Sequence, residues 1–264
     1  MAAEPDFGEL LFTLSNDDRL EILRLLMEDE QRMTGLANRI GSTPQETSRN
    51  IGRLQGNQLV DRTPDGTYRV TPYGSHIHHF VRPLRFLYSH RDYFREHTFS
   101  VIPSRFLSRI GELEGSGYSG DVMFSFHSVV QMIEEAEEYV WIMSNQILMS
   151  TLQPLHQALG RGVVFRLIIP LGLQPPAEFL EHVNSEVWRG DRSEMRVRER
   201  CEYVVTMSEK TAFVSFPTQD GKLDYLGFRA EKGEAHEWCR ELFLDSWRAS
   251  REKLGFFESI RPLE

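Results

Sequence analysis

The fold of the N-terminal part is decided by residues 15–74, SNDDRLEILRLLMEDEQRMTGLANRIGSTPQETSRNIGRLQGNQLVDRTPDGTYRVTPYG. Apolar residues recur at helical spacing in its first part, and a glycine then separates two short helical segments. A Pro-Asp-Gly turn separates two strand-like runs, and a further helical segment begins at Pro72. This order of helix, short helix, turn, second short helix, hairpin and helix predicts a winged helix-turn-helix.

Local signals place the second short helix at about 44–58. Thr43 followed by Pro44 is typical of an N-cap and a first helical residue, and Glu46 completes a capping box with Thr43. Gly41 suits the left-handed position that ends the preceding helix. A tight turn therefore joins the two short helices.

This helix has one apolar and one polar face. Thr47, Ile51 and Leu54 should be buried, whereas the opposite face carries side chains that suit phosphates and base edges in a DNA major groove. Arginines on both sides of the hairpin turn would contact the DNA backbone. The alternative is a winged-helix adaptor that binds protein instead of DNA. The predicted DNA-binding residues are Thr43, Gln45, Ser48, Arg49, Asn50, Arg53, Arg62 and Arg69.

The distribution of charge favours double-stranded DNA as a partner. The chain of 264 residues has a formal net charge of −9, which alone argues against nucleic acid. Residues 32–109, however, hold twelve Arg and no Lys against five acidic residues, a net charge of +7. Residues 1–31 and 110–264 carry −7 and −9. Because phosphate neutralisation dominates DNA affinity, the positive block supports the motif, although a solvated surface could be segregated in the same way.

The length of the chain is enough for two domains. Cys201 and Cys239 lie in apolar contexts without metal-ligand spacing, so we expect reduced, buried thiols and neither a metal site nor a cofactor. No signal peptide and no apolar run of about 18 residues is present, which predicts a soluble, cytoplasmic protein without a membrane partner.

Residues 76–109 read as a helical linker and dimerisation segment. A helix should run from Pro72 to about Val81, with Pro83 as a kink or a restart. Its apolar face exceeds what a small winged helix can bury, so a second subunit would cover it in a homodimer on palindromic DNA; the alternative is packing within the chain. That face comprises Ile77, Phe80, Val81, Leu84, Leu87, Tyr88 and Phe94.

Five histidines fall in the same segment. Two of them share a helical face, which is compatible with a metal sensor. No cysteine or acidic cluster accompanies them, so solvated or interface roles are favoured. The five are His76, His78, His79, His90 and His97.

From residue 110 onward, helices alternate with strands, which predicts a layered α/β domain. Helices are expected at 127–138, 148–160, about 176–184 and about 234–253, and strands at 139–144, 163–170, 201–207, 211–217 and 223–229.

Four segments resemble archaeal winged-helix regulators with the methanogenesis regulatory protein middle domain. They are DYFREHTFSVIPSRFLSRIGEL (92–113), EEAEEYVWIMSNQ (134–146), RGVVFRLIIP (161–170) and ELFLDSWRAS (241–250). The resemblance follows the order of segments over nearly the whole chain. It implies a transcription regulator whose C-terminal half is similar to the phospholipase D fold. The expected organisation is α/β: a winged helix-turn-helix at 1–75, the linker at 76–109 and a layered phospholipase D-like effector-sensing domain at 110–264.

That similarity raises the alternative of a phospholipase D-type phosphodiesterase. Such catalysis needs a His nucleophile, a Lys two residues later and an Asp further along. In the matching stretch CEYVVTMSEKTAFVS (201–215), these positions hold Cys201, Tyr203 and Ser208. All three catalytic roles are empty, so we expect a protein that is not an enzyme.

The resemblance further implies that the cleft of such a fold persists without its catalyst and senses a small molecule. Strand ends should converge there, and two arginines among neutral polar groups suit a small anionic effector. The alternative is that the arginines only balance an acidic surface. The expected effector-binding residues are Asn145, Gln146, Arg166, Arg198, Tyr203 and Ser208.

Overall fold

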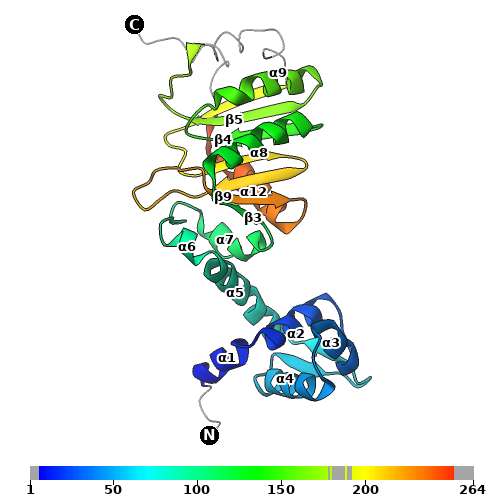
Figure 1. The fold of residues 1–264 in the computed structure, drawn as a ribbon. Helices are drawn as coiled ribbons and strands as arrows, with labels where there is room; N and C mark the ends of the chain where they lie inside the picture. The colour runs from blue at the N-terminus through cyan, green and yellow to red at the C-terminus, as the bar shows by residue number, and fades with distance from the viewer. Residues whose placement is uncertain (1–5, 178, 180–187, 189–191, 253–264) are drawn as a thin grey trace. The chain divides into compact units, whose positions relative to one another are not determined.

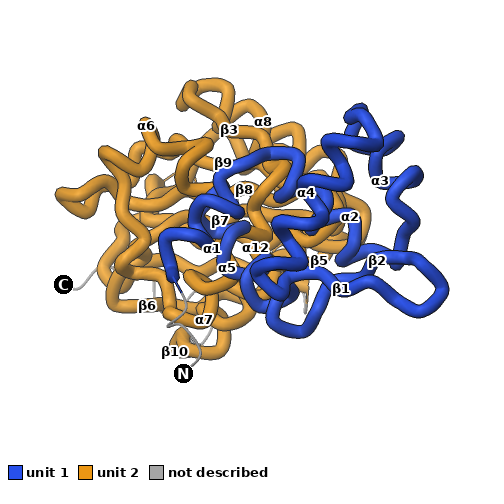
Figure 2. Tube along the Cα trace, turned by 90° about the horizontal axis from the view of Figure 1, so that it is seen from below, with its two compact units in different colours: residues 1–85 blue, residues 86–264 orange. Residues whose placement is uncertain are grey.

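The computed structural model describes residues 6–177, 179, 188 and 192–252 (Figure 1). The chain is mixed α/β and divides into two compact units, Met1–Arg85 and Phe86–Glu264 (Figure 2). Among the described helices, none has the length and apolar character needed to span a membrane.

The N-terminal unit has the order of helices and strands that residues 15–74 predict. A short helix, α1, precedes them, and the last helix, α5, continues past the boundary between the units. The elements are α1 (Phe7–Leu14), α2 (Asp17–Glu28), α3 (Met33–Ile40), α4 (Pro44–Gly56), β1 (Val60–Arg62), β2 (Tyr68–Val70) and α5 (Pro72–Ser89).

The turn between α3 and α4 forms as its sequence predicts. Gly41 has φ +67°, a left-handed conformation that costs glycine little. Thr43 caps α4: its hydroxyl accepts the backbone N–H of Glu46 at 3.2 Å, and the Glu46 carboxylate accepts the backbone N–H of Thr43 at 3.3 Å. Both ends of the turn are therefore fixed by local bonds.

The hairpin is held directly against the start of α5. The Thr71 hydroxyl donates to the carbonyl oxygen of Gln58 at 2.7 Å and accepts the backbone N–H of Gly74 at 2.8 Å. A Cβ on Gly74 would lie 2.0 Å from the carbonyl oxygen of Leu59, so only glycine allows this approach.

α5 corrects one prediction, because the helix does not stop near Val81 but runs through Pro83 to Ser89. Proline lacks an N–H, so the carbonyl oxygen of His79 loses its usual helical donor. One lost bond in a helix of 18 residues leaves the turns on both sides intact.

The described part of the C-terminal unit contains one eight-stranded mixed sheet with helices on both faces (Figure 1). Its helical elements are α6 (Arg91–Phe94), α7 (Ser104–Leu107), η1 (Ile110–Leu113), α8 (Val122–Glu135), η2 (Met149–Thr151), α9 (Leu152–Gly160) and α12 (Glu234–Ala249). Its strands are β3 (Gly117–Ser119), β4 (Tyr139–Met143), β5 (Val164–Pro170), β6 (Ser193–Arg198), β7 (Val204–Ser208), β8 (Thr211–Ser215), β9 (Gly227–Glu231) and β10 (Arg251–Glu252).

The strand order is β10-β6-β5-β4-β7-β8-β9-β3. The pairs β4–β5 and β5–β6 are parallel, and the other neighbours are antiparallel. α8 and α9 cover one face of this sheet and α12 covers the other (Figure 1). The side chains of β4 and β5 alternate between two separate hydrophobic cores, as a pleated strand requires.

Residues 86–107 pack in the core on the α12 side. Phe86, Tyr93, Ile102 and Phe106 are buried there with Trp238 and Phe243 of α12 as partners in the same cluster. Much of the segment expected to be a separate linker thus belongs to the C-terminal unit.

Three strands in the C-terminal unit were not predicted. β6 reads SEMRVR, in which Met195 and Val197 are buried between charged residues, β3 covers only the three residues Gly117–Ser119, and β10 covers two residues where a helix was expected. Alternation over so few residues is a weak signal. The helix expected at 127–138 begins five residues earlier as α8, and most of the helix expected at about 176–184 falls outside the described residues.

Candidate nucleic-acid interface and candidate ligand pocket

α4 presents a polar face opposite its buried one. Thr47, Ile51 and Leu54 are buried, as predicted. The side chains of the other face are exposed to solvent, and two of them are arginines one helical turn apart. These exposed residues are Gln45, Ser48, Arg49 and Arg53.

Two of the predicted DNA-binding residues are engaged within the unit. Thr43 forms the capping box, and its hydroxyl lies 2.8 Å from the Glu46 carboxylate. The half-buried Asn50 has its amide nitrogen 3.4 Å from Asp18 and its amide oxygen 3.4 Å from a guanidinium nitrogen of Arg19. Thr43 therefore fixes the start of α4, and Asn50 links α4 to α2.

Arg53 also has an internal contact, because its guanidinium lies 5.1 Å from the ring centroid of Phe12 on α1. Since Arg53 stays exposed, its charge remains accessible while the aromatic ring restricts its direction.

The hairpin carries the two other predicted arginines. Arg62 ends β1 and Arg69 lies in β2, opposite Asp61 in the antiparallel register. Both arginines are exposed, and the guanidinium of Arg62 lies 5.9 Å from the ring centroid of Tyr68. The hairpin thus presents two cations on a short, well-paired element.

Two acidic residues of α2, Glu21 and Glu28, are paired with arginines outside α4. Arg24 bonds to Glu21 at 2.8 Å and to Glu28 at 2.5 Å, and Glu28 also binds Arg39 of α3 at 2.9 Å. Three carboxylate–guanidinium contacts therefore neutralise part of the acidic N-terminal block.

The six expected effector-binding residues do not line one cavity. Arg166 and Tyr203 lie on the α12 face of the sheet, whereas Gln146 borders a pocket on the α8–α9 face. Successive side chains of a strand point to opposite faces of the sheet. Side chains near neighbouring strand ends can therefore lie on opposite sides of the sheet. The expected convergence on one cleft is thus corrected.

Arg166 is held by aromatic and acidic neighbours. Its guanidinium lies 5.3 Å from the ring centroid of Trp141 and 5.2 Å from that of Trp247, and it pairs with Glu194 at 3.6 Å. Arg198 lies instead beside a surface hollow with Arg200 and Arg251. The two arginines thus have different surroundings.

Cys201, Tyr203 and Ser208, the residues that the sequence resemblance aligned with a phospholipase D catalyst, are buried in the C-terminal unit. Burial raises the pKa of the Cys201 thiol to about 12, which keeps it protonated and a poor nucleophile. The Tyr203 hydroxyl bonds to Ser246 of α12 at 2.6 Å. The Ser208 hydroxyl accepts the backbone N–H groups of Lys210 and Thr211 at 3.2 and 3.3 Å.

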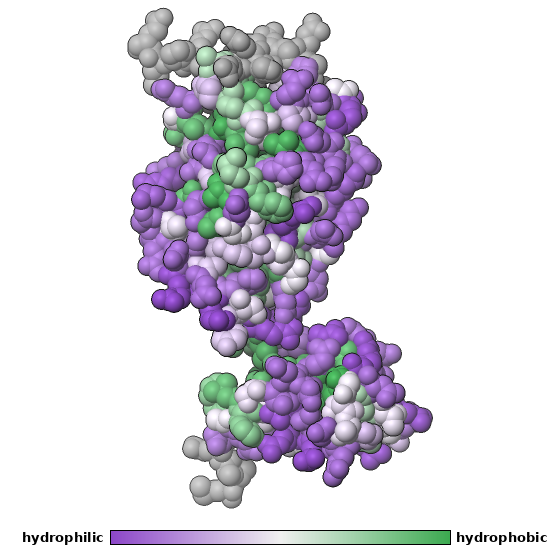
Figure 3. Space-filling model, viewed as in Figure 1, coloured by the Kyte–Doolittle hydropathy of each residue, from purple (hydrophilic) through white to green (hydrophobic). Residues whose placement is uncertain are grey.

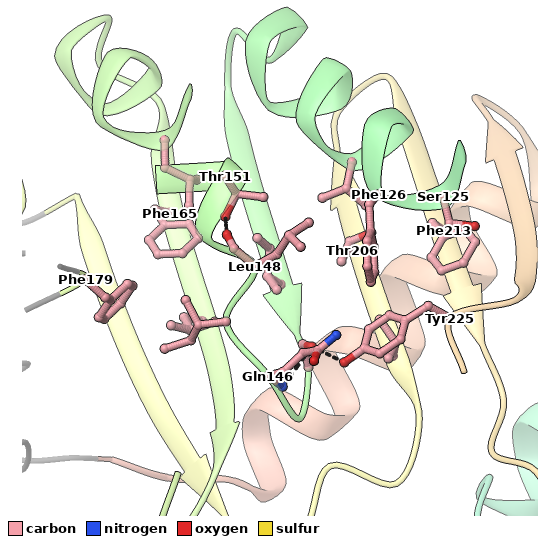
Figure 4. A pocket seen from close by; sticks show the side chains of 17 residues that line it. Ser125, Phe126, Gln146, Leu148, Thr151, Phe165, Phe179, Thr206, Phe213 and Tyr225 are labelled. Atoms are coloured by element: carbon pink, nitrogen blue, oxygen red, sulfur yellow. Dashed lines mark hydrogen bonds between the residues drawn. The ribbon is translucent and has the colours of Figure 1, made fainter. Parts of the chain in front are cut away.

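A pocket between the sheet and α8 was missed by the sequence reasoning (Figure 4). Its wall is formed mainly by apolar side chains of α8, β4, β5, β7 and β8, which read in sequence as ordinary core residues. Of the predicted effector-binding residues, Gln146 alone lines it among the residues described. Ser144 and Tyr225 stand beside Gln146, and the hydroxyls of Ser144 and Tyr225 lie 3.3 Å apart.

In the described ranges, no three side chains of His, Cys, Asp or Glu are positioned to hold a metal ion together. His97 is buried, and its ring nitrogens lie 2.9 Å from the carbonyl oxygen of Tyr93 and 2.9 Å from the Asp224 carboxylate. Burial lowers the pKa of His90.

No family model and no curated protein matches the chain. Among solved structures, it is similar to TrmBL2, an archaeal chromatin protein, with 12% identity over 94% of this chain and 100% of that chain at a TM-score of 0.42. A phospholipase D family member, Nuc from Salmonella typhimurium, is 14% identical over 53% of this chain and 97% of its own, with a TM-score of 0.39.

The homodimeric winged helix-turn-helix DNA-binding domain of Mb0332 from Mycobacterium bovis is 22% identical over 34% of this chain and 95% of that domain, with a TM-score of 0.30. At these identities and TM-scores, the three likenesses establish neither a family nor a function for this chain.

Proposed function

We propose that the protein is a sequence-specific DNA-binding transcription regulator whose N-terminal unit works as a winged helix-turn-helix. The observation that carries this proposal is the exposed face of α4, which presents Gln45, Ser48, Arg49 and Arg53 on a helix anchored by its opposite face. The sequence segments that resemble the methanogenesis regulatory protein middle-domain family support the same assignment.

In this proposal α4 enters the major groove. Arg49 and Arg53 are long enough to reach base edges or phosphates, and the bidentate pairing of arginine with guanine supplies sequence information. Arg62 and Arg69 of the hairpin would contact phosphates beside the groove and fix the orientation of the helix. Most of the affinity would come from phosphate neutralisation and would fall with salt.

The proposal extends to a homodimer. Phe80 and Leu84 lie one turn apart on α5 and are 64% and 66% exposed, and Tyr88 follows one turn later at 71%. Three large apolar side chains in one row on a helix are costly in water. A second copy related by a two-fold axis would cover them and place two copies of α4 on a palindromic site.

We further propose that the C-terminal unit senses a small molecule. The unit has a partly open apolar pocket with polar groups at one end, which is the usual form of a small-molecule site. To regulate, the bound molecule must bind the DNA-competent and DNA-incompetent states with different affinity.

The test is fluorescence anisotropy with a labelled duplex from the region upstream of the protein's own coding sequence, titrated at several salt concentrations. A scrambled duplex of the same composition is the competitor. Tighter binding to the upstream duplex, with a negative salt slope, supports the proposal. Equal binding to both duplexes, or no binding at low salt, contradicts it and favours a protein-binding adaptor.

A further inference from the structure

The pocket on the α8–α9 face contains a hydroxyl group without a partner. The Thr206 side chain on β7 is 4% exposed, and its oxygen has no hydrogen-bond partner among the described residues. A buried hydroxyl left unbonded destabilises a fold, so its retention in the wall of a cavity needs a reason.

The other hydroxyls of the pocket are already bonded. Ser125 bonds to Ser119 at 2.8 Å, Thr151 donates to the carbonyl oxygen of Leu148 at 2.6 Å, and Ser144 lies 3.3 Å from the Tyr225 hydroxyl. Within the described lining, the Thr206 hydroxyl is therefore the one for which the structure shows no hydrogen-bond partner.

The remaining wall is apolar and carries aromatic rings at both ends. Phe165 and Phe179 lie on one side and Phe126, Phe213 and Tyr225 on the other (Figure 4). The cavity itself has a volume of about 50 Å³, several times what one water molecule needs and enough only for a compact molecule. Since no charged side chain lines it among the residues described, an ion would lose its hydration there without a counter-charge.

The mouth of the pocket is held by a strained residue. Tyr225 has φ +63°, an unusual conformation for a bulky side chain, and its ring packs 5.2 Å from that of Phe126. Its hydroxyl also donates to the Asn145 side chain. Strain of this kind persists where the surroundings fix it and is concentrated at ligand sites.

We infer that this pocket binds a small neutral molecule, with an apolar ring packed between the phenylalanines and one hydroxyl or carbonyl group hydrogen-bonded to Thr206. Entry is past Gln146 and Tyr225. This deepens the proposed function by naming the chemical class of the sensed molecule, and it replaces the anionic effector. It rests on the proposed function only for the effect on DNA.

The test is isothermal titration calorimetry of the full chain with three probes: phenol, benzene and benzoate. Phenol should bind saturably, benzene more weakly and benzoate not measurably. Thr206→Val, which keeps the shape and removes the hydroxyl, should weaken phenol binding about three- to tenfold and leave benzene binding unchanged. Thr151→Val is the matched control, because its hydroxyl is already bonded, and should change phenol binding less than twofold.

A second pair of variants tests the location. Val129 on α8 lines the pocket, whereas its neighbour Val130 does not line it in the described structure and has similar partial burial. Val129→Trp should abolish phenol binding and Val130→Trp should retain it. Thermal unfolding of each variant shows whether it is folded, so a failure to fold is not mistaken for a lost site.

The proposal is overturned if benzoate binds as well as phenol or if Val129→Trp binds phenol normally. It is also overturned if Thr206→Val leaves phenol binding unchanged, because the Thr206 hydroxyl would then bond only to water. None of these titrations contains DNA. A chain that binds phenol but no duplex would therefore refute the proposed function and leave this site standing.

Discussion

The hydroxyl of Tyr203, the residue before β7, and the Ser246 hydroxyl on α12 lie 2.6 Å apart in the buried interface between sheet and helix. Ser246 also lies 3.0 Å from the carbonyl oxygen of Leu242, so the pair completes a short chain of bonds to the helix backbone. A side chain considered for ligand binding is thus part of the contact that seats α12 on the sheet.

Replacing Tyr203 with Phe should lower the free energy of unfolding by about 0.5–1.5 kcal/mol, because one buried hydrogen bond is lost and Ser246 keeps its bond to Leu242. Urea unfolding followed by circular dichroism measures the change. In a double-mutant cycle with Ser246→Ala, the two effects should be non-additive. Strict additivity would mean that the two hydroxyls do not interact.

Replacing Arg49 with Ala should weaken specific DNA binding by about 1–3 kcal/mol and relax specificity at one base pair, because an arginine in the groove reads a guanine edge. Arg62→Ala should instead weaken binding to all sequences alike. Arg248→Ala, an exposed arginine of α12, is the control of equal charge change and should have little effect. Anisotropy on a set of single-base operator variants measures both affinity and specificity. Normal affinity in a Gln45, Arg49 and Arg53 triple alanine variant would refute the groove assignment.

Replacing both Phe80 and Leu84 with Asp should give monomers, since two carboxylates would have to be buried at the dimer seam. Sedimentation velocity at micromolar concentration measures the state of assembly. His79→Asp adds a charge to the same helix off the row of exposed apolar residues and should remain dimeric. A wild-type protein that sediments as a monomer would exclude the dimer.

Glu209 should make stability fall at acid pH. Burial alone would raise the pKa of this carboxyl, but backbone N–H donors outweigh it and lower the pKa: the carboxylate accepts those of Glu137, Glu138 and Tyr139 at 2.9, 3.2 and 3.3 Å. A pKa that is lower in the folded state than in the unfolded one stabilises the fold above the unfolded value. That contribution is lost as the pH falls below 4.5 through the folded pKa.

The measurement is the free energy of unfolding of wild type and Glu209→Gln between about pH 3 and pH 7. The variant should be less stable near neutral pH, and the difference should shrink as the pH falls. Glu138→Gln is the control, because the structure assigns its side chain no such set of backbone donors. Parallel curves for wild type and Glu209→Gln would contradict the role of the carboxylate.

Local signals in the sequence were sufficient for the elements from α2 to β2. Thr43, Pro44 and Glu46 fix the start of α4 through bonds that reach only three residues, and Gly41 ends α3 through its own backbone conformation. The periodic apolar residues also identified the buried face of α4. Such features depend only on residues that are close together in the sequence, so they can be predicted from the sequence alone.

The candidate site of the C-terminal unit could not be found in this way. Arg166 lies in a predicted strand and Gln146 follows another, but the two side chains lie on opposite faces of the sheet. The face that a side chain takes depends on the strand register and on which strands pair. In the sequence, Thr206 reads as an ordinary strand residue. In the structure it lines a pocket together with Phe126 of α8 and Tyr225 of a loop distant in sequence.

The sequence by itself determined the order of elements at 15–74 and the polar face of α4. Tertiary structure alone decided that Asn50 is engaged with Asp18, that Arg166 packs between two tryptophans and that a pocket opens beside Thr206. The physical reason is range: capping and periodicity act over one or two helical turns. A cavity or a buried pair, in contrast, exists only after residues distant in sequence have packed together.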